Sequence, residues 1–149
     1  MYLKQVFPEN SGPIALINLM KHFKKRYSRK NLEDIQKLCG SEYNFGTYKF
    51  QFTNGLEKLL LDFDFENDRN VTINKINLHL KSGPAVLGYE TNKNIIQNFL
   101  VILARTANFY TVTNYNGKSL TRISKDTLKD IVRNNKDNLN AWFIKGVTT

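Results

Sequence analysis

The sequence predicts an α+β domain in which N-terminal helices pack on one side of a C-terminal antiparallel sheet, with residues 1–149 forming a single unit. Two observations carry this prediction. Apolar residues recur at helical spacing through the first 62 residues, and short alternating or continuous apolar runs separated by turn residues follow from residue 63 onward. The composition agrees, because 41% apolar residues in a chain of 149 is enough to build one core.

Three helices are expected in the first half of the chain. The first runs from about residue 12 to 25 after an extended segment, and its apolar residues cover more than one face, so we expect it to be buried. The second begins with Asn31 as its N-cap and ends at Cys39-Gly40. The third spans residue 53 or 54 to 62. The polar and aromatic segment Ser41–Phe52 between them is expected to be a loop, with Gly46 as its turn.

The second half of the chain changes to strand patterns. A short strand is expected at residues 63–66, whereas residues 73–80 fit a short helix and a strand equally well. Further strands are expected at residues 85–90, 99–103, 109–112, 120–123 and 141–144. Asn116-Gly117 predicts a hairpin turn. Ser124 is expected to cap a short helix that carries Leu128 and Ile131.

Composition excludes several classes of protein. No apolar run reaches the roughly 18 to 20 residues of a membrane span, and the N-terminus lacks the cationic start and apolar run of a signal peptide. The single cysteine, Cys39, excludes an internal disulfide and fits a reducing cytosol. The two histidines, His22 and His79, stand apart in the sequence, so we expect neither a metal nor any other cofactor.

The net charge of +9 has two possible explanations. Cations crowd residues 21–30, at the end of the first predicted helix, where they suit the negative end of the helix dipole. The same cations are also suited to an acidic partner such as nucleic acid or anionic lipid. Nucleic acid is not favoured, because only Phe23 and Tyr27 are interleaved with these cations.

The candidate chemistry centres on Ser11, which precedes Gly12-Pro13 at the start of the first predicted helix. Pro is well tolerated at the first helical position, so Ser11 is expected at the helix N-terminus. A buried helix with a nucleophile-type residue at this end is the architecture of papain-like cysteine peptidases. In those enzymes the helix end lowers the pKa of the nucleophilic thiol. Here the residue is a serine.

Further motifs accompany Ser11 along the chain. Gln5 lies six positions before Ser11, and Gly12 follows it directly. The other segments are, in order, Leu38–Leu60, Gly83–Leu87, Asn98–Val101, Val112–Gly117 and Trp142. In this order the motifs resemble the double-glycine leader peptidase domain of bacterial ABC exporters, including bacteriocin exporters. The resemblance covers essentially the whole chain and implies a papain-like cysteine peptidase fold.

The resemblance also shows where the chain departs from its family. In the family a Cys attacks the peptide carbonyl, a His takes its proton, an Asp orients the His and a Gln helps to bind the oxyanion. The residues at those places here are Ser11, Asn98, Asn114 and Gln5. An amide cannot accept a proton near neutral pH, so Asn98 cannot serve as the base. We therefore expect no peptide hydrolysis by this mechanism, although the fold is that of an enzyme.

Three explanations of these departures are open. The first is natural loss of activity, which would leave a pseudopeptidase. The second is an engineered change of Cys to Ser at the nucleophile position. The third is a misassigned triad in which His22 or His79 is the base. His22 lies about 16 Å from Ser11 along a helix axis, His79 is expected to be a surface histidine, and Cys39 is expected to be a small buried apolar residue.

The resemblance implies a role in export. The leading hypothesis is a catalytically degenerate domain that binds or gates a peptide or protein export substrate at the cytoplasmic face of the bacterial membrane. Its partners would be the leader peptide and the membrane and ATPase domains of the exporter. The alternative is an active double-glycine leader peptidase of a bacteriocin-type transporter with a substituted nucleophile. Aromatic residues of Tyr43–Phe52 and Tyr89 are candidate substrate contacts.

Overall fold

A six-stranded sheet in which every neighbouring pair is antiparallel forms the centre of the fold. The computed structural model describes residues 2, 11–23, 34, 35, 37, 49–59, 64–90, 97–116 and 118–145. The strands are β1 (Asp64–Asp68), β2 (Ala85–Glu90), β3 (Gln97–Arg105), β4 (Phe109–Thr113), β5 (Thr121–Ser124) and β6 (Asn140–Lys145). Their spatial order is β1-β6-β2-β3-β4-β5, so the last strand of the chain lies inside the sheet between β1 and β2.

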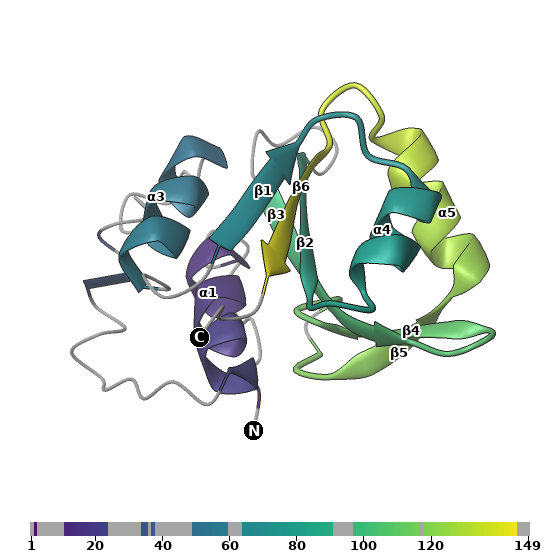
Figure 1. Ribbon diagram of the computed structural model, residues 1–149, viewed down its shortest axis with the longest axis horizontal. Helices are drawn as coiled ribbons and strands as arrows, with labels where there is room; N and C mark the ends of the chain where they lie inside the picture. The colour runs from purple at the N-terminus through teal and green to yellow at the C-terminus, as the bar shows by residue number, and fades with distance from the viewer. Residues whose placement is uncertain are drawn as a thin grey trace.

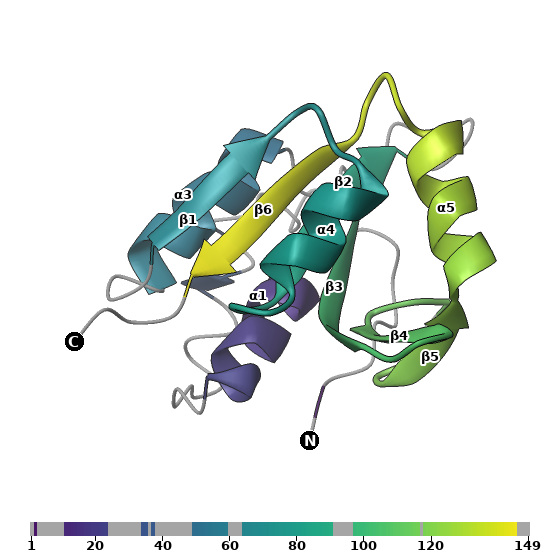
Figure 2. The ribbon, with the colours of Figure 1, turned by 45° about the vertical axis from the view of Figure 1, so that its right-hand side comes forward.

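The helices are divided between the two faces of this sheet. They are α1 (Ser11–His22), α3 (Lys49–Leu59), α4 (Ile73–His79) and α5 (Lys125–Asn134). Both ribbon views place α1 and α3 on one side of the sheet and α4 and α5 on the other (Figures 1 and 2). The predicted α+β class and the packing of the N-terminal helices on one side of the sheet are therefore confirmed, and the later helices α4 and α5 cover the other side.

Two apolar clusters explain why both faces need helices. Side chains alternate between the faces of a strand. On β3, Phe99 and Val101 belong to the cluster beneath α1 and α3, while Leu100 and Ile102 belong to the cluster beneath α4 and α5. The strands β2 and β6 alternate in the same way. These central strands are apolar on both sides, and burying both faces requires a layer on each.

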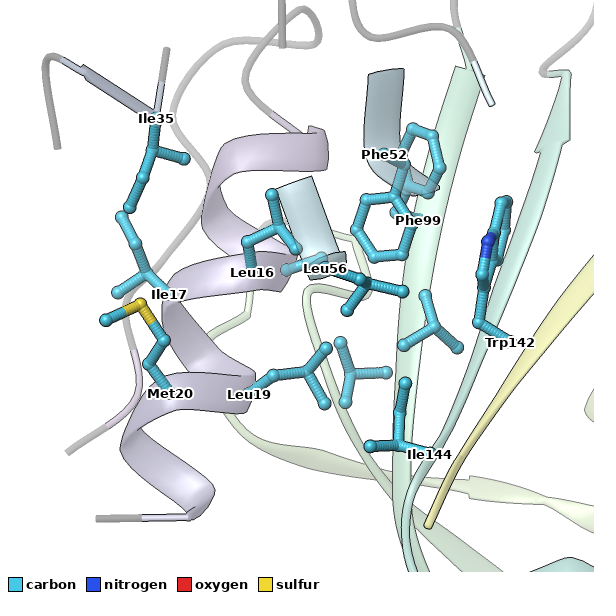
Figure 3. Packing of buried hydrophobic residues seen from close by; sticks show 13 residues of the cluster. Leu16, Ile17, Leu19, Met20, Ile35, Phe52, Leu56, Phe99, Trp142 and Ile144 are labelled. Atoms are coloured by element: carbon cyan, nitrogen blue, oxygen red, sulfur yellow. The ribbon is translucent and has the colours of Figure 1, made fainter. Parts of the chain in front are cut away.

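The first helix is buried on more than one side, as its sequence predicts. Every residue from Ser11 to Met20 is buried. Figure 3 shows Leu16 directed towards Leu56 and Phe99, while Ile17 lies on the side of Ile35. The described helix ends at His22, with Phe23 in a turn, and the rest of the predicted helix to residue 25 lies outside the described residues.

The predicted loop Ser41–Phe52 is partly wrong, because Lys49–Phe52 belong to α3. Phe52 is fully buried; its ring stacks on Phe99 at 4.5 Å and meets Trp142 edge-on at 4.8 Å (Figure 3). Burial of the Phe52 ring stabilises a helix at residues 49–52, although the local sequence predicts a loop there. Of the second predicted helix, Asp34, Ile35 and Lys37 are helical and the remainder lies outside the described residues, as does Gly46.

The ambiguous segment 73–80 is a helix. Thr72 caps α4, since its side chain accepts a hydrogen bond from the backbone N–H of Lys75 at 3.2 Å. Ser124 caps α5 in the same way, as the sequence predicts. The short strand expected at residues 63–66 is β1, which runs to Asp68; Phe63 lies outside the described residues. No helix among the described residues is long and apolar enough to cross a membrane.

Candidate functional site

Ser11 is the first described residue of α1 and is almost completely buried, with 1% of its surface exposed. Its hydroxyl lies against β3, where the backbone N–H of Phe99 donates a hydrogen bond to Ser11 Oγ at 2.8 Å. This bond joins residues that are 88 positions apart in the sequence. It fixes the start of α1 to the central strand of the sheet.

Asn114 is the second residue of the site and lies just beyond the end of β4. Its Nδ2 lies 3.1 Å from Ser11 Oγ, 3.0 Å from Ser11 O and 2.9 Å from Phe99 O. Two of these neighbours are carbonyl oxygens, which only accept hydrogen bonds, so the amide nitrogen must face them. The amide carries two hydrogens for three acceptors, so one N–H is shared.

The side chains of Ser11 and Asn114 take the place of a neighbouring strand beside Phe99. The ladder between β3 and β4 ends with the pair Val101–Thr113. Continuing it by two residues would place the chain beyond β4 opposite Phe99. Instead Asn114 turns the backbone with φ at 65°, a left-handed conformation that Asn tolerates. Ser11 and Asn114 then bond the N–H and C=O of Phe99, completing the backbone hydrogen bonding of β3.

This geometry determines what the Ser11 hydroxyl can do. A hydroxyl oxygen has two lone pairs, and Ser11 Oγ receives one N–H from Phe99 and one from Asn114. A nucleophile needs a free lone pair and a base to take its proton. The arrangement therefore uses the hydroxyl as a buried hydrogen-bond acceptor.

One oxygen of the site has no partner in the described part of the chain. Asn114 Oδ1 is buried and accepts no hydrogen bond there, and the same holds for Oγ1 of the adjacent Thr113. A buried acceptor without a donor costs roughly 1–3 kcal/mol. The side chain of Asn114 is therefore held by its nitrogen alone.

Asn98 does not join Ser11 and Asn114. It is half-buried on β3, directly opposite Tyr89 of β2. Cross-strand partners share a face of the sheet, and Tyr89 packs against the cluster beneath α4 and α5. No hydrogen bond links the Asn98 side chain to Ser11 or Asn114 among the described residues. Burial, with a smaller effect of nearby Tyr115, raises the pKa of the Tyr89 hydroxyl to about 12.

Neither histidine contacts Ser11 in the described structure. His22 lies at the far end of α1, where its Nδ1 is 3.4 Å from the Tyr2 hydroxyl and burial lowers the pKa of its imidazole. His79 lies on α4, and its Nε2 is 3.1 Å from Pro84 O and 2.9 Å from Ile144 O. Both contacts are to carbonyls, so Nε2 carries the proton and His79 ties α4 to the sheet. A misassigned triad with either imidazole as its base is therefore wrong.

Gln5 and Cys39 lie outside the described residues. In the part of the chain that is described, no cluster of three or more His, Cys, Asp or Glu side chains could hold a metal ion.

Comparison with solved structures shows which known proteins share this fold. The peptidase domain of Streptococcus ComA, described as a bi-functional ABC transporter involved in a quorum sensing pathway, aligns with a TM-score of 0.71 over 97% of this chain and 98% of that domain, at 17% identity. The chain has the fold of this peptidase domain.

A second structure is similar to the same extent. It is a double glycine motif protease from an AMS/PCAT transporter in complex with the leader peptide, with a TM-score of 0.71, 14% identity and coverage of 99% of this chain and 91% of that one. The peptidase domain of Streptococcus mutans ComA aligns with a TM-score of 0.61 at 15% identity, over 97% of this chain and 98% of that one. No family model matches the sequence, and no curated protein does either.

Sequence reasoning singled out Ser11 and Asn114 but missed the group that joins them. Their shared partner is the backbone of Phe99, which follows Asn98 in the sequence. A hydrogen bond made by backbone atoms does not depend on residue type, so a sequence pattern does not predict it. The available signal was the position of Asn114 two residues after the end of a predicted strand, where an Asn often turns the chain and bonds to nearby backbone.

Proposed function

We propose that this double-glycine peptidase fold is catalytically degenerate and that the chain binds or gates a peptide or protein export substrate without cleaving it. The similarity to a protease whose structure holds its leader peptide supports a peptide as the ligand. The similarity to peptidase domains of ABC transporters supports an exporter's membrane and ATPase domains as partners, at the cytoplasmic face of the membrane.

The observation that carries the proposal is the state of the Ser11 hydroxyl. Both of its lone pairs face N–H donors, from Phe99 and Asn114. Attack on a peptide carbonyl would require breaking one of these buried hydrogen bonds as well as finding a base. Position 98, where the resemblance places the histidine, holds an amide that cannot accept the proton.

The unpartnered Oδ1 of Asn114 supports the same conclusion. The resemblance places Asn114 where the family has the Asp that orients its histidine. Asn114 Oδ1 is buried and has no donor in the described part of the chain, so no base is oriented by it there. Asn114 has its amide nitrogen on Ser11 itself, so the residue that would orient a base instead holds the nucleophile position in place.

Recognition of a substrate does not require the lost chemistry. A leader can be held as a helix in a groove or as an extended chain, and both modes use surface contacts away from the reacting atoms. Of the aromatic residues expected to contact it, Phe52 is fully buried and is excluded as a surface contact. Phe50 is 66% exposed, and Tyr89 is partly buried, so these two remain candidates within the described chain.

The test is a cleavage and binding assay with a synthetic double-glycine leader peptide. Mass spectrometry follows cleavage, and fluorescence anisotropy of the labelled peptide follows binding. The chain is compared with a Ser11→Cys, Asn98→His, Asn114→Asp triple variant, whose folding is checked by its melting temperature. We expect the unaltered chain to bind the peptide and leave it intact, and the variant to cut it.

Two results would count against the proposal. Cleavage by the unaltered chain, abolished by Ser11→Ala, would establish the alternative function of an active leader peptidase. Absence of binding by both proteins, while the folded state is confirmed, would remove the leader peptide as the ligand.

A further inference from the structure

A polar pocket lies away from the residues around Ser11. It has a volume of about 510 Å³ and is formed by the start of α3, the end of β1 and the segment 136–140 that leads into β6. Ser11, Phe99 and Asn114 are not among its lining residues. Four charged side chains line it, Lys49, Arg69, Lys136 and Asp137. Three cations and one carboxylate give the lining a formal charge of +2.

One cation of this pocket, Lys49, is held in place. Lys49 is half-buried, and its Nζ donates a hydrogen bond to the backbone carbonyl of Asn138. Burial lowers the pKa of the Lys49 ammonium; the nearby Glu90 opposes this effect, and Arg69 adds to it. Arg69 thus repels Lys49 across the pocket. An anion bound between the two would relieve that repulsion.

The walls of the pocket are fixed by hydrogen bonds of its own asparagine side chains. Asn140 Nδ2 donates to Asn67 Oδ1 at 3.2 Å, joining β6 to β1. Asn138 Oδ1 accepts from the backbone N–H of Glu90 at 3.2 Å, joining the segment before β6 to the end of β2. Because Lys49 is held on this fixed frame, it loses little freedom when a ligand binds, which favours a specific site over a diffuse basic surface.

The charge and size of the pocket indicate the class of ligand. A phosphate monoester carries about −1.5 to −2 charges at pH 7 and offers three acceptor oxygens, which matches the formal +2 of the lining. A single carboxylate offers two acceptor oxygens and one charge, fewer than the three lining cations can contact. The cavity is also larger than a bare phosphate needs, and the ring of Phe50, 66% exposed, is part of its lining. An organic group attached to the phosphate would fill the remaining space against that ring.

We propose that the pocket lined by Lys49, Arg69 and Lys136 binds a phosphate monoester of a small organic molecule. Lys49 and Arg69 contact the phosphate oxygens, and Phe50 packs against the organic group. The proposal goes beyond export-substrate binding and uses none of the residues around Ser11; Phe50 is the one residue that it shares with the candidate leader contacts.

Isothermal titration calorimetry with phenyl phosphate tests the assignment, in a buffer free of phosphate. We expect saturable binding that is tighter than for inorganic phosphate, which lacks the ring, and tighter than for phenyl sulfate, which carries one charge fewer. Arg69→Gln should weaken binding about 10-fold or more, the usual effect of losing one charge-assisted hydrogen bond. Lys49→Met should do the same, but Arg69→Gln is the safer variant because Arg69 is exposed.

The matched control is Lys129→Gln, which removes one positive charge from the exposed surface of α5. An equal loss of affinity in Lys129→Gln and Arg69→Gln would show that only net charge matters and would overturn the proposal. The proposal would also fail if phenyl phosphate gave no saturable binding to the folded chain.

The ligand has two possible sources, a soluble phosphate monoester and the phosphate headgroup of a lipid. Flotation with phosphatidylcholine vesicles, with and without phosphatidate, separates them. Flotation that depends on both phosphatidate and Arg69 assigns the headgroup. Binding of phenyl phosphate without flotation assigns a soluble ligand.

Discussion

Replacing Asn114 with aspartate should destabilise the fold strongly, although the two side chains have the same shape. The Asn114 amide donates towards two buried carbonyls, Phe99 O at 2.9 Å and Ser11 O at 3.0 Å. A carboxylate oxygen in its place cannot donate and would face both carbonyls. Each deprived acceptor costs about 1–3 kcal/mol, so the free energy of unfolding should fall by roughly 4 kcal/mol. For a domain of this size that lowers Tm by about 8–16 °C.

The destabilisation should depend on pH. The introduced carboxyl is favoured in its neutral form in the folded protein, so its folded pKa lies above the ~3.9 of an unperturbed aspartate. Below that unfolded value both states are protonated and the charge-dependent part of the penalty vanishes. As pH rises towards the folded pKa, the unfolded state loses its proton first and stability falls. The Tm of Asn114→Asp should therefore approach that of the parent protein near pH 4.

The structure provides a control that isolates burial. Asn116 also has a positive φ, 49°, but it is exposed. Asn116→Asp makes the same chemical change in a similar backbone conformation and should alter stability by no more than about 0.5 kcal/mol. Thermal unfolding followed by circular dichroism at pH 7 and pH 4 measures all three proteins. A Tm for Asn114→Asp within a degree of the Tm of Asn116→Asp at pH 7 would refute the reasoning.

Three further predictions concern the fold around the site. Gly88→Ala would place a Cβ 2.7 Å from Cζ3 of Trp142; we expect a loss of about 1–3 kcal/mol, with a shift in emission of this single tryptophan. Ser124→Ala removes the N-cap of α5 and should lower stability by about 1 kcal/mol in urea unfolding. The hydrogen bond from Lys75 is the main cause that lowers the pKa of Asp68. Asp68→Asn should therefore destabilise the protein at pH 7, and the difference from the parent should shrink as pH falls through the folded pKa of this carboxyl.

The strands were the most predictable part of the fold because their signals are local. Segments 85–90 and 109–112 read as strands from apolar runs bounded by Gly, Pro and Asn, and both are strands. The position of β6 inside the sheet was not predictable, since pairing with β1 and β2 depends on residues far away in the sequence. For the same reason residues 49–52 were assigned to a loop. Only the contact of Phe52 with Phe99 and Trp142 reveals why they are helical.

The candidate site was half predictable. The order of motifs identified Ser11 and Asn114, and the structure brings these two together. The same motifs placed Asn98 beside them, yet its partner in the sheet is Tyr89 and it takes no described part in their network. Residue type and order reveal which positions a family uses. They do not reveal how hydrogen bonds rearrange when several of those residues change together.

The residues at the site are mutually consistent, and this supports the proposal of a naturally degenerate site over that of a single engineered change. A serine oxygen is a better hydrogen-bond acceptor than a cysteine sulfur, and Ser11 Oγ accepts from two N–H groups. An asparagine, unlike an aspartate, can donate to the carbonyls of Ser11 and Phe99. Each residue supports the other's contacts, so Ser11→Cys alone should weaken this network without restoring a base. A change of Cys to Ser made only to trap a substrate would not account for the amide at position 114, whose nitrogen lies within hydrogen-bond distance of Ser11 O, Ser11 Oγ and Phe99 O.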